Sequence, residues 1–197
     1  MRPEIILAFD TAAAHCAAAV LWGEGLVVQR VETCVEVMAK GQAERLVPMI
    51  EGFMAGHAVG WGDLTSIAVG VGPGNFTGVR ISVALARGLA LGRGIPAVGV
   101  TGFEVLGAGA AWAVIDAPRG QVYVQGAGAA RVMGADEVAG LDEPVRRMSD
   151  LSPAELAGRI AEVGFVKARV PQPRPAPFYL RGAEALPSTD PPVVILP

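Results

Sequence analysis

Three predicted strands precede the first predicted helix, and this opening restricts the possible folds more than any other feature of the chain. Ile5 to Phe9 is an unbroken apolar run that ends at Asp10, which is typical of a central strand covered on both faces. Ala17 to Trp22 and Leu26 to Thr33 follow as two further strands, one on each side of a glycine turn. The chain therefore begins with a double hairpin.

Helices and strands alternate in the next part of the chain. Apolar residues recur at helical spacing from about Ala39 to Ala55, and a second helix is predicted from about Thr77 to Arg93. Short buried strands are predicted at Ser66 to Val71 and Ala97 to Val100. The order β-β-β-α-β-α-β is the outline of an α/β ribonuclease H-like or actin-like half, and the opening double hairpin argues against the flavodoxin-like alternative.

The second half of the chain has weaker patterns and predicts a smaller lobe. Ala113 to Asp116 and Gln121 to Gln125 predict a hairpin, and a helix is expected from a Ser152 cap to about Ala161. Alternating prolines then predict an extended strap. We expect three parts, namely residues 1–102 as an N-terminal actin-like lobe, 103–177 as a smaller second lobe, and 178–197 as a C-terminal tail whose packing on the first lobe stays open.

Composition and charge favour a cytoplasmic protein without a membrane segment. Hydrophobic residues make up 52 % of the chain, but no run reaches the roughly 18 apolar residues that span a bilayer. The longest apolar region, Val79 to Leu91, is broken by Arg80 and Arg87, and the N-terminal apolar run is too short for a signal peptide. The formal net charge is −3 and no large basic cluster is present, so any work on nucleic acid depends on a partner.

A glycine-rich loop between a buried strand and a helix, Gly72 to Arg80, is the most informative motif. One interpretation is a vestigial nucleotide or anion site, because glycines allow close backbone approach and a helix N-terminus offers unpaired N–H groups. The alternative is a tight turn in which Phe76 packs inward and Thr77 caps the helix, which the lack of a P-loop lysine favours. The residues assigned to the candidate anion site are Asp10, Thr11, Gly72, Gly74 and Thr77.

Other chemistry has little support in the chain. Asp10 is followed by alanines and has no lysine nearby, so we expect a buried, hydrogen-bonded residue at the end of a strand rather than a complete nucleotide site. His15 and His57 are the only histidines, and they lie on different predicted elements without other ligands at suitable spacing. We therefore assign no catalytic residue, no metal site and no cofactor to this chain alone.

Several blocks of the sequence match one family in order and spacing. Residues 72–80 read GPGNFTGVR, which is similar to the GPGSFTGLR signature of the TsaB/YeaZ family. The opening strand, QAERLVPMI at residues 42–50, IDAPRGQVY at 115–123 and FYLR at 178–181 also resemble that family. The resemblance covers most of residues 5–125 and a short C-terminal island.

This resemblance implies an actin-like fold with a complete first lobe and a reduced second lobe. It implies a non-catalytic scaffold subunit of the tRNA adenosine threonylcarbamoyltransferase complex, which pairs with a TsaD-type catalytic subunit and associates with a TsaE-type ATPase. Those partners would use ATP and metal, and tRNA would be reached only through the complex. The older peptidase label has no metal or nucleophile–base pair to support it. Because the proline-rich end is short, we expect the helix that closes over the first lobe to be missing.

The two predicted helices carry the candidate partner surface. The second helix is apolar nearly all round, so both of its sides must be covered. Packing within the chain explains this pattern as well as a partner's helices do, and the resemblance favours the partner. The residues assigned to the interface are Met49, Phe53, Val83, Ala84, Arg87 and Leu91.

Two other functions stay open at this point. The first is a stand-alone actin-like ATPase or small-molecule kinase, and the second is a homodimeric interaction module unrelated to tRNA. The sequence also leaves open whether the isolated chain is a monomer or a homodimer.

Overall fold

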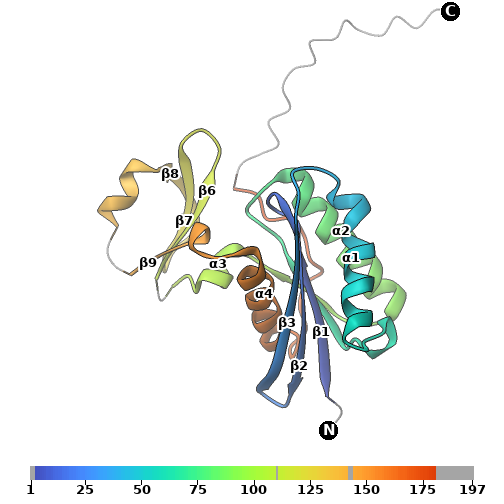
Figure 1. Cartoon of the computed structure of the whole chain (residues 1–197). Coiled ribbons are helices and arrows are strands. Elements are labelled where there is room, and N and C mark those ends of the chain that lie inside the picture. Colours follow the sequence, from blue (N-terminus) through green and yellow to red (C-terminus); the bar gives the residue numbers. More distant parts are fainter. Residues whose placement is uncertain (1–2, 110, 142–143, 181–197) are drawn as a thin grey trace, which may run out of the picture.

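The computed structural model describes residues 3–109, 111–141 and 144–180, and this part of the chain contains two sheets (Figure 1). The first sheet has five strands in the order β3-β2-β1-β4-β5. Its strands are β1 (Glu4–Asp10), β2 (His15–Glu24), β3 (Val27–Val37), β4 (Ser66–Gly70) and β5 (Ala97–Val100). The first three form an antiparallel meander, and β4 and β5 extend it in parallel with β1. This topology confirms the predicted actin-like, ribonuclease H-like α/β fold.

Both faces of the first sheet are covered, as the apolar run in β1 predicts. Successive side chains of a strand point to opposite faces. Leu7 and Phe9 accordingly pack with the helices on one face, while Ile6 and Ala8 pack with the helix on the other. These four side chains are at most 1 % exposed. The sheet is therefore the middle layer of three.

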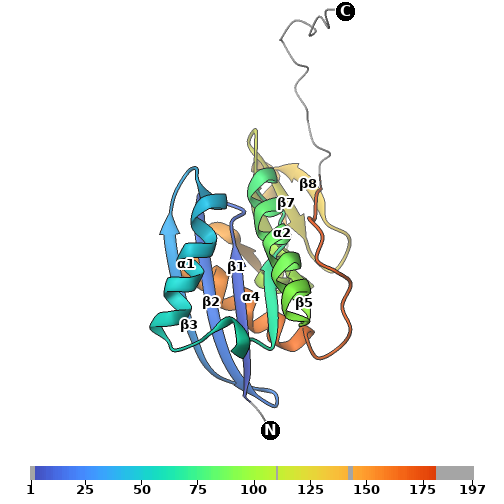
Figure 2. The ribbon, with the colours of Figure 1, turned by 90° about the vertical axis from the view of Figure 1, so that its right-hand side faces the viewer.

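Helices α1 (Gln42–Gly56) and α2 (Phe76–Arg93) cover one face, and α4 (Pro153–Lys167) covers the other (Figure 2). The N-terminus of α4 is held by a capping box between Ser152 and Glu155. The helix runs well beyond the predicted end at Ala161 and buries Ile160 and Phe165 against the sheet. The expectation that no helix closes over the first lobe is therefore wrong.

The second sheet has four strands in the order β8-β7-β6-β9. Its strands are β6 (Trp112–Ala117), β7 (Gln121–Gln125), β8 (Arg131–Gly134) and β9 (Val145–Arg147). The remaining elements are α3 (Gly102–Leu106) and the short 3-10 turns η1 (Trp61–Asp63), η2 (Asp136–Gly140) and η3 (Met148–Asp150). The antiparallel pairing of β6 with β7 confirms the predicted hairpin, whereas β8, β9 and α3 are not predicted by the sequence.

The chain returns to the first sheet after it has built the second. Because α4 packs on the first sheet, this helix is part of the first lobe, although its sequence range was assigned to the second. The division at residues 102 and 177 otherwise stays a prediction. The Phe178 N–H donates to the Val71 carbonyl at 2.8 Å, so the start of the tail lies against the first lobe, and residues 181–197 lie outside the described residues. No described helix combines the length and apolarity needed to cross a bilayer.

Candidate functional site

Asp10, at the end of β1, is buried and hydrogen-bonded, as predicted. Only 3 % of the residue is exposed, and its Oδ1 accepts the Ala12 N–H at 2.8 Å. His15 Nε2 lies 3.1 Å from the same oxygen atom and is itself buried. This pair forms only when β2 turns back beside β1, so local sequence patterns do not reveal it.

The glycines after β4 let the chain approach itself closely. A Cβ atom at Gly78 would collide with the Thr11 carbonyl oxygen, and a Cβ atom at Gly70 would collide with the Asp10 carboxylate. The Thr11 hydroxyl donates to the Gly78 carbonyl at 2.7 Å, and the Asn75 N–H donates to the Ala12 carbonyl at 2.7 Å. The loop is thus tied to the end of β1, in agreement with the tight-turn interpretation.

Two details of that interpretation are wrong. The cap of α2 is Asn75, whose Oδ1 accepts the Gly78 N–H at 2.9 Å, rather than Thr77. Phe76 does not pack into the core but stacks on Tyr179, with ring centroids 4.9 Å apart. The Arg80 guanidinium lies 3.6 Å from the centroid of the Phe76 ring and donates to the Tyr179 hydroxyl at 3.1 Å. This cluster holds the start of the tail against α2.

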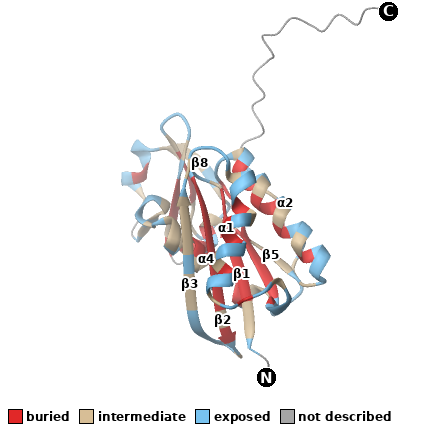
Figure 3. Ribbon diagram, turned by 45° about the vertical axis from the view of Figure 1, so that its right-hand side comes forward, coloured by how far each residue is buried: buried red, intermediate tan, exposed pale blue. Residues whose placement is uncertain are grey.

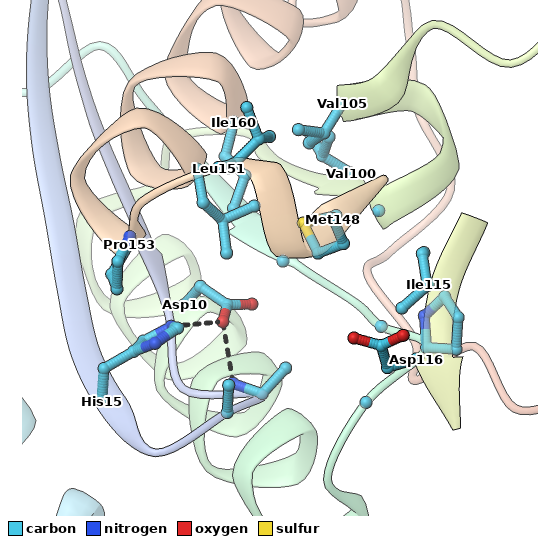
Figure 4. A pocket seen from close by; sticks show the side chains of 18 of the residues that line it. Asp10, His15, Val100, Val105, Ile115, Asp116, Met148, Leu151, Pro153 and Ile160 are labelled. Atoms are coloured by element: carbon cyan, nitrogen blue, oxygen red, sulfur yellow. Dashed lines mark hydrogen bonds and ion pairs between the residues drawn. The ribbon is translucent and has the colours of Figure 1, made fainter. Parts of the chain in front are cut away.

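A cavity of about 340 Å³ lies between the ends of the first-sheet strands and the second sheet (Figure 4). Its polar end contains the side chains of Asp10, His15 and Asp116. Its glycine rim includes Gly72 and Gly74. Its apolar wall includes Val100, Val105, Ile115, Met148, Leu151 and Ile160. No lysine or arginine lines this cavity within the described ranges.

Asp116 is a cavity residue that was not among the residues predicted for a site. It lies near the end of β6, the first strand of the second sheet, and follows the buried residues Ala113 to Ile115. Asp10 likewise follows the buried apolar run of β1, and each of these strands continues into an antiparallel hairpin. An apolar run that ends in aspartate and precedes a hairpin therefore occurs in both sheets, and this repeated pattern was the available signal.

The structure brings only part of the candidate anion site together. Asp10, Gly72 and Gly74 line the cavity. Thr11 is fully buried and uses its hydroxyl within the chain, and Thr77 lies exposed on the first turn of α2, outside the cavity lining. An anion site made of all five residues stays a prediction.

The outer faces of α1 and α2 are open to solvent, as the exposed colouring in Figure 3 shows. Ala84, Arg87 and Leu91 lie on one exposed stripe of α2, and Leu91 is 83 % exposed. Phe53 is half-buried and packs edge-on against His57, with ring centroids 5.0 Å apart. We refer to the exposed residues of α1 and α2 as the outer helix face.

Met49 and Val83 are wrongly assigned to the interface. Met49 is 4 % exposed and Val83 is 3 % exposed, and both side chains belong to the core between the helices and the first sheet. The inward side of α2 consists largely of small residues, including Ser82, Ala86 and Ala90. The sequence could not reveal this orientation, because a helix that is apolar nearly all round has no unique inward side.

Gly52 in α1 and Gly88 in α2 are exposed glycines that lie at least a full turn from the helix ends and have no packing role within the described chain. A Cβ atom at either position would meet no atom within 4 Å outside the helix itself. A glycine inside a helix costs about 0.5–1 kcal/mol relative to alanine. The isolated fold therefore provides no physical reason for these two glycines.

Comparison with known proteins agrees with this geometry. A family model described as TsaD, tRNA N6-adenosine threonylcarbamoyltransferase, matches residues 35–185. The Escherichia coli protein named tRNA threonylcarbamoyladenosine biosynthesis protein TsaB is 38 % identical over 127 residues, which is 60 % of this chain and 52 % of that relative. An uncharacterized Mycobacterium bovis protein is 32 % identical over 92 % of this chain and 94 % of its own length. The chain belongs to this family, as a TsaB/YeaZ member.

A solved TsaB/YeaZ structure shares the fold along nearly the whole described chain. YeaZ from Pseudomonas aeruginosa superposes with a TM-score of 0.67 at 25 % identity, covering 90 % of this chain and all of that one. By sequence, the chain spans about half the length of the TsaB relatives that it matches in Escherichia coli and Haemophilus influenzae.

Proposed function

We propose that this chain is the non-catalytic scaffold subunit of a tRNA adenosine threonylcarbamoyltransferase complex, and that it binds a TsaD-type catalytic subunit through the outer helix face. Relatives named for tRNA threonylcarbamoyladenosine biosynthesis, together with the matching transferase family model, support the pathway. The outer helix face supports the mode of binding, because α1 and α2 are adjacent and present one open surface.

The observation that carries this proposal is the pair of exposed glycines, Gly52 and Gly88. Both weaken their own helices, and neither relieves a clash within the chain. Small residues on a helix surface let the backbone of a second helix approach closely. Leu91, on the same stripe of α2 as Gly88, adds an exposed apolar side chain to the surface. A partner's helices packed against α1 and α2 would make use of all three residues.

The cavity lining supports the assignment of phosphoryl chemistry to the partner subunits rather than to this chain. Phosphoryl chemistry needs cations that neutralise the developing charge, whereas the described cavity lining carries two carboxylates and no lysine or arginine. ATP and metal therefore belong to the TsaD-type and TsaE-type subunits in this proposal. With a formal net charge of −3, the chain reaches tRNA only through the complex.

The test is binding to a purified TsaD-type subunit, measured by size-exclusion chromatography with light scattering. Leu91→Asp on α2 is compared with Val166→Asp on α4, since Val166 is 62 % exposed on the opposite side of the sheet. Leu91→Asp should weaken the heterodimer by at least about tenfold, and Val166→Asp should bind like the unchanged chain. Equal binding by both variants would show that the interface does not include the outer helix face.

The same experiment tests the interaction-module alternative, because it also reports the mass of the isolated chain. An interaction module unrelated to tRNA would be favoured by two results together. The isolated chain would form a homodimer that Leu91→Asp dissociates, and it would not bind the TsaD-type subunit. A monomer or an exchangeable homodimer that the TsaD-type subunit converts into a heterodimer supports the scaffold.

A stand-alone actin-like ATPase or small-molecule kinase is the second candidate function, because Asp10 and Asp116 face one cavity at the ends of corresponding strands. Calorimetry with ATP and Mg²⁺ on the isolated chain separates the two. The scaffold proposal expects no saturable binding, and nucleotide turnover by the isolated chain would favour the kinase.

A further inference from the structure

The interlobe cavity has a charge pattern that the scaffold role does not use. Its ionisable lining consists of Asp10, His15 and Asp116, with no lysine or arginine from the described part of the chain. Charges interact more strongly where access of water is restricted, which applies to Asp10 at 3 % exposure but not to the exposed Asp116. Both carboxylates favour cations over anions, and Asp10 contributes the larger share. Phosphates and carboxylates are therefore poor ligands for it.

One oxygen atom of Asp10 is available to a ligand. Oδ1 is occupied by the Ala12 N–H and by His15. No described residue donates a hydrogen bond to Oδ2, although only 3 % of Asp10 is exposed. Among the described residues, every fully buried side-chain nitrogen or oxygen atom has a hydrogen-bond partner. Oδ2 has none, so it is not fully buried, and because Asp10 lines the cavity, a ligand there can contact it. An ionised carboxylate oxygen in such a place is best satisfied by a positively charged donor.

Asp116 supplies a second carboxylate from the other lobe. In Figure 4 the carboxyl groups of Asp10 and Asp116 point into the same space from opposite sides. The Asp116 carboxylate has no hydrogen-bond or ion-pair partner among the described residues. A donor placed between the two carboxylates would therefore contact both lobes.

The rest of the cavity is suited to an apolar body. Val105, Leu151 and Ile160 form part of a largely apolar wall beyond the carboxylates. At about 30 Å³ per water-sized group, a volume of about 340 Å³ holds roughly ten non-hydrogen atoms. A bare metal ion leaves this wall unused, and no group of three or more metal ligands occurs among the described residues.

We propose that the cavity binds a small organic monocation, with its ammonium group between Asp10 and Asp116 and its apolar body against Val105, Leu151 and Ile160. The three donor hydrogens of a primary ammonium group match the free Oδ2 atom of Asp10 and the two oxygen atoms of the Asp116 carboxylate. This site goes beyond the scaffold role and needs no partner subunit, so it stands or fails independently of the proposed function.

The test is an NMR titration of the isolated chain with phenethylamine, 2-phenylethanol and 3-phenylpropionate. These probes share a phenyl ring on a short chain and differ in charge. Phenethylamine should give saturable shifts at the backbone amides of Gly70 and Gly102 in the cavity lining. Its affinity should exceed that of the alcohol by about tenfold, the ratio expected for one charge-assisted hydrogen bond. Similar affinities for all three probes, or tighter binding of Mg²⁺-ATP, would overturn the proposal.

Two variants separate a site from a general effect of negative charge. Asp116→Asn removes one carboxylate from an exposed position, so it leaves the core intact and should weaken phenethylamine binding by about tenfold. Asp150→Asn removes the same charge from the adjacent η3 turn, outside the cavity lining, and should leave binding unchanged. Equal binding by Asp116→Asn and the unchanged chain, or equal losses in both variants, would contradict the site.

Discussion

Lys167 Nζ on α4 lies 2.6 Å from Oε1 of Glu104 on α3 and 2.7 Å from the Gly99 carbonyl oxygen of β5. This ammonium group therefore joins the helix that closes the first sheet to the short helix that leads into the second. Thr101 strengthens the arrangement, since its N–H donates to the Glu104 carboxylate at 2.7 Å. The contact therefore ties α4 and β5 to α3.

Glu104 should make stability depend on pH. Burial raises the pKa of its carboxyl, but hydrogen bonds from Lys167 and Thr101 outweigh burial, so the pKa lies below its ordinary value of 4.5. The folded state therefore favours the ionised form, and its contribution is present above 4.5 and is lost as pH falls through the lower folded value. Glu104→Gln should cost on the order of 1 kcal/mol at neutral pH, a low figure because 38 % of the side chain is exposed.

Urea denaturation at neutral and acidic pH measures this effect, with Glu162→Gln on the exposed side of α4 as the control. The difference between Glu104→Gln and the unchanged chain should shrink in acid. A difference that stays constant across this pH range would exclude the ion pair as its cause.

Gly88→Ala should stabilise the isolated chain by about 0.5–1 kcal/mol, because the new methyl group meets open space and the helix gains propensity. The same change should weaken binding to the TsaD-type subunit. Gly164→Ala on α4 is the contrasting variant, since its methyl group would collide with Ala68 and should destabilise by about 1–3 kcal/mol. Denaturant midpoints and binding titrations check both effects, and a Gly88→Ala chain that is less stable than the unchanged one would contradict this account.

Met49→Ala should destabilise the fold by about 2–5 kcal/mol, because it leaves a cavity between α1 and the first sheet. Leu91→Ala should change the free energy of unfolding by no more than about 0.5 kcal/mol, since its side chain is 83 % exposed. Urea unfolding followed by circular dichroism compares them. Similar losses in both variants would show that the outer helix face is not free in the isolated chain.

The two cysteine thiols should react at different rates in the folded chain. Burial raises the pKa of the Cys16 thiol to about 11, and the buried Sγ contacts Met38 and the Gln42 carbonyl. Burial also raises the pKa of Cys34, which is less enclosed. Because the thiolate is the reactive form, alkylation by iodoacetamide near neutral pH should modify Cys34 first. Mass spectrometry after limited reaction checks this, and faster modification of Cys16 would contradict the burial.

Local patterns were sufficient for most of the first sheet. The apolar run of β1, the periodicity of α1 and the glycine that ends α2 each depend on neighbouring residues, so they are visible in one dimension. The short strands β8 and β9 escaped prediction because each contains arginine and neither has a buried apolar run. The equally short β5 was predicted because its residues are all apolar or glycine. The end of α4 was predicted too early because Gly164 interrupts the helical pattern. Close packing against Ala68 requires a glycine at this position.

By itself the sequence determined the fold class, the tight glycine loop and the burial of Asp10, because these follow from residue type and nearest neighbours. Only the tertiary structure decided that Val83 points inward, that His15 pairs with Asp10, and that Asp116 shares a cavity with them. The reason is physical. Local preferences are free energies of single segments, whereas a helix's inward side and a cavity's lining arise when separate segments pack together and exclude water from between them.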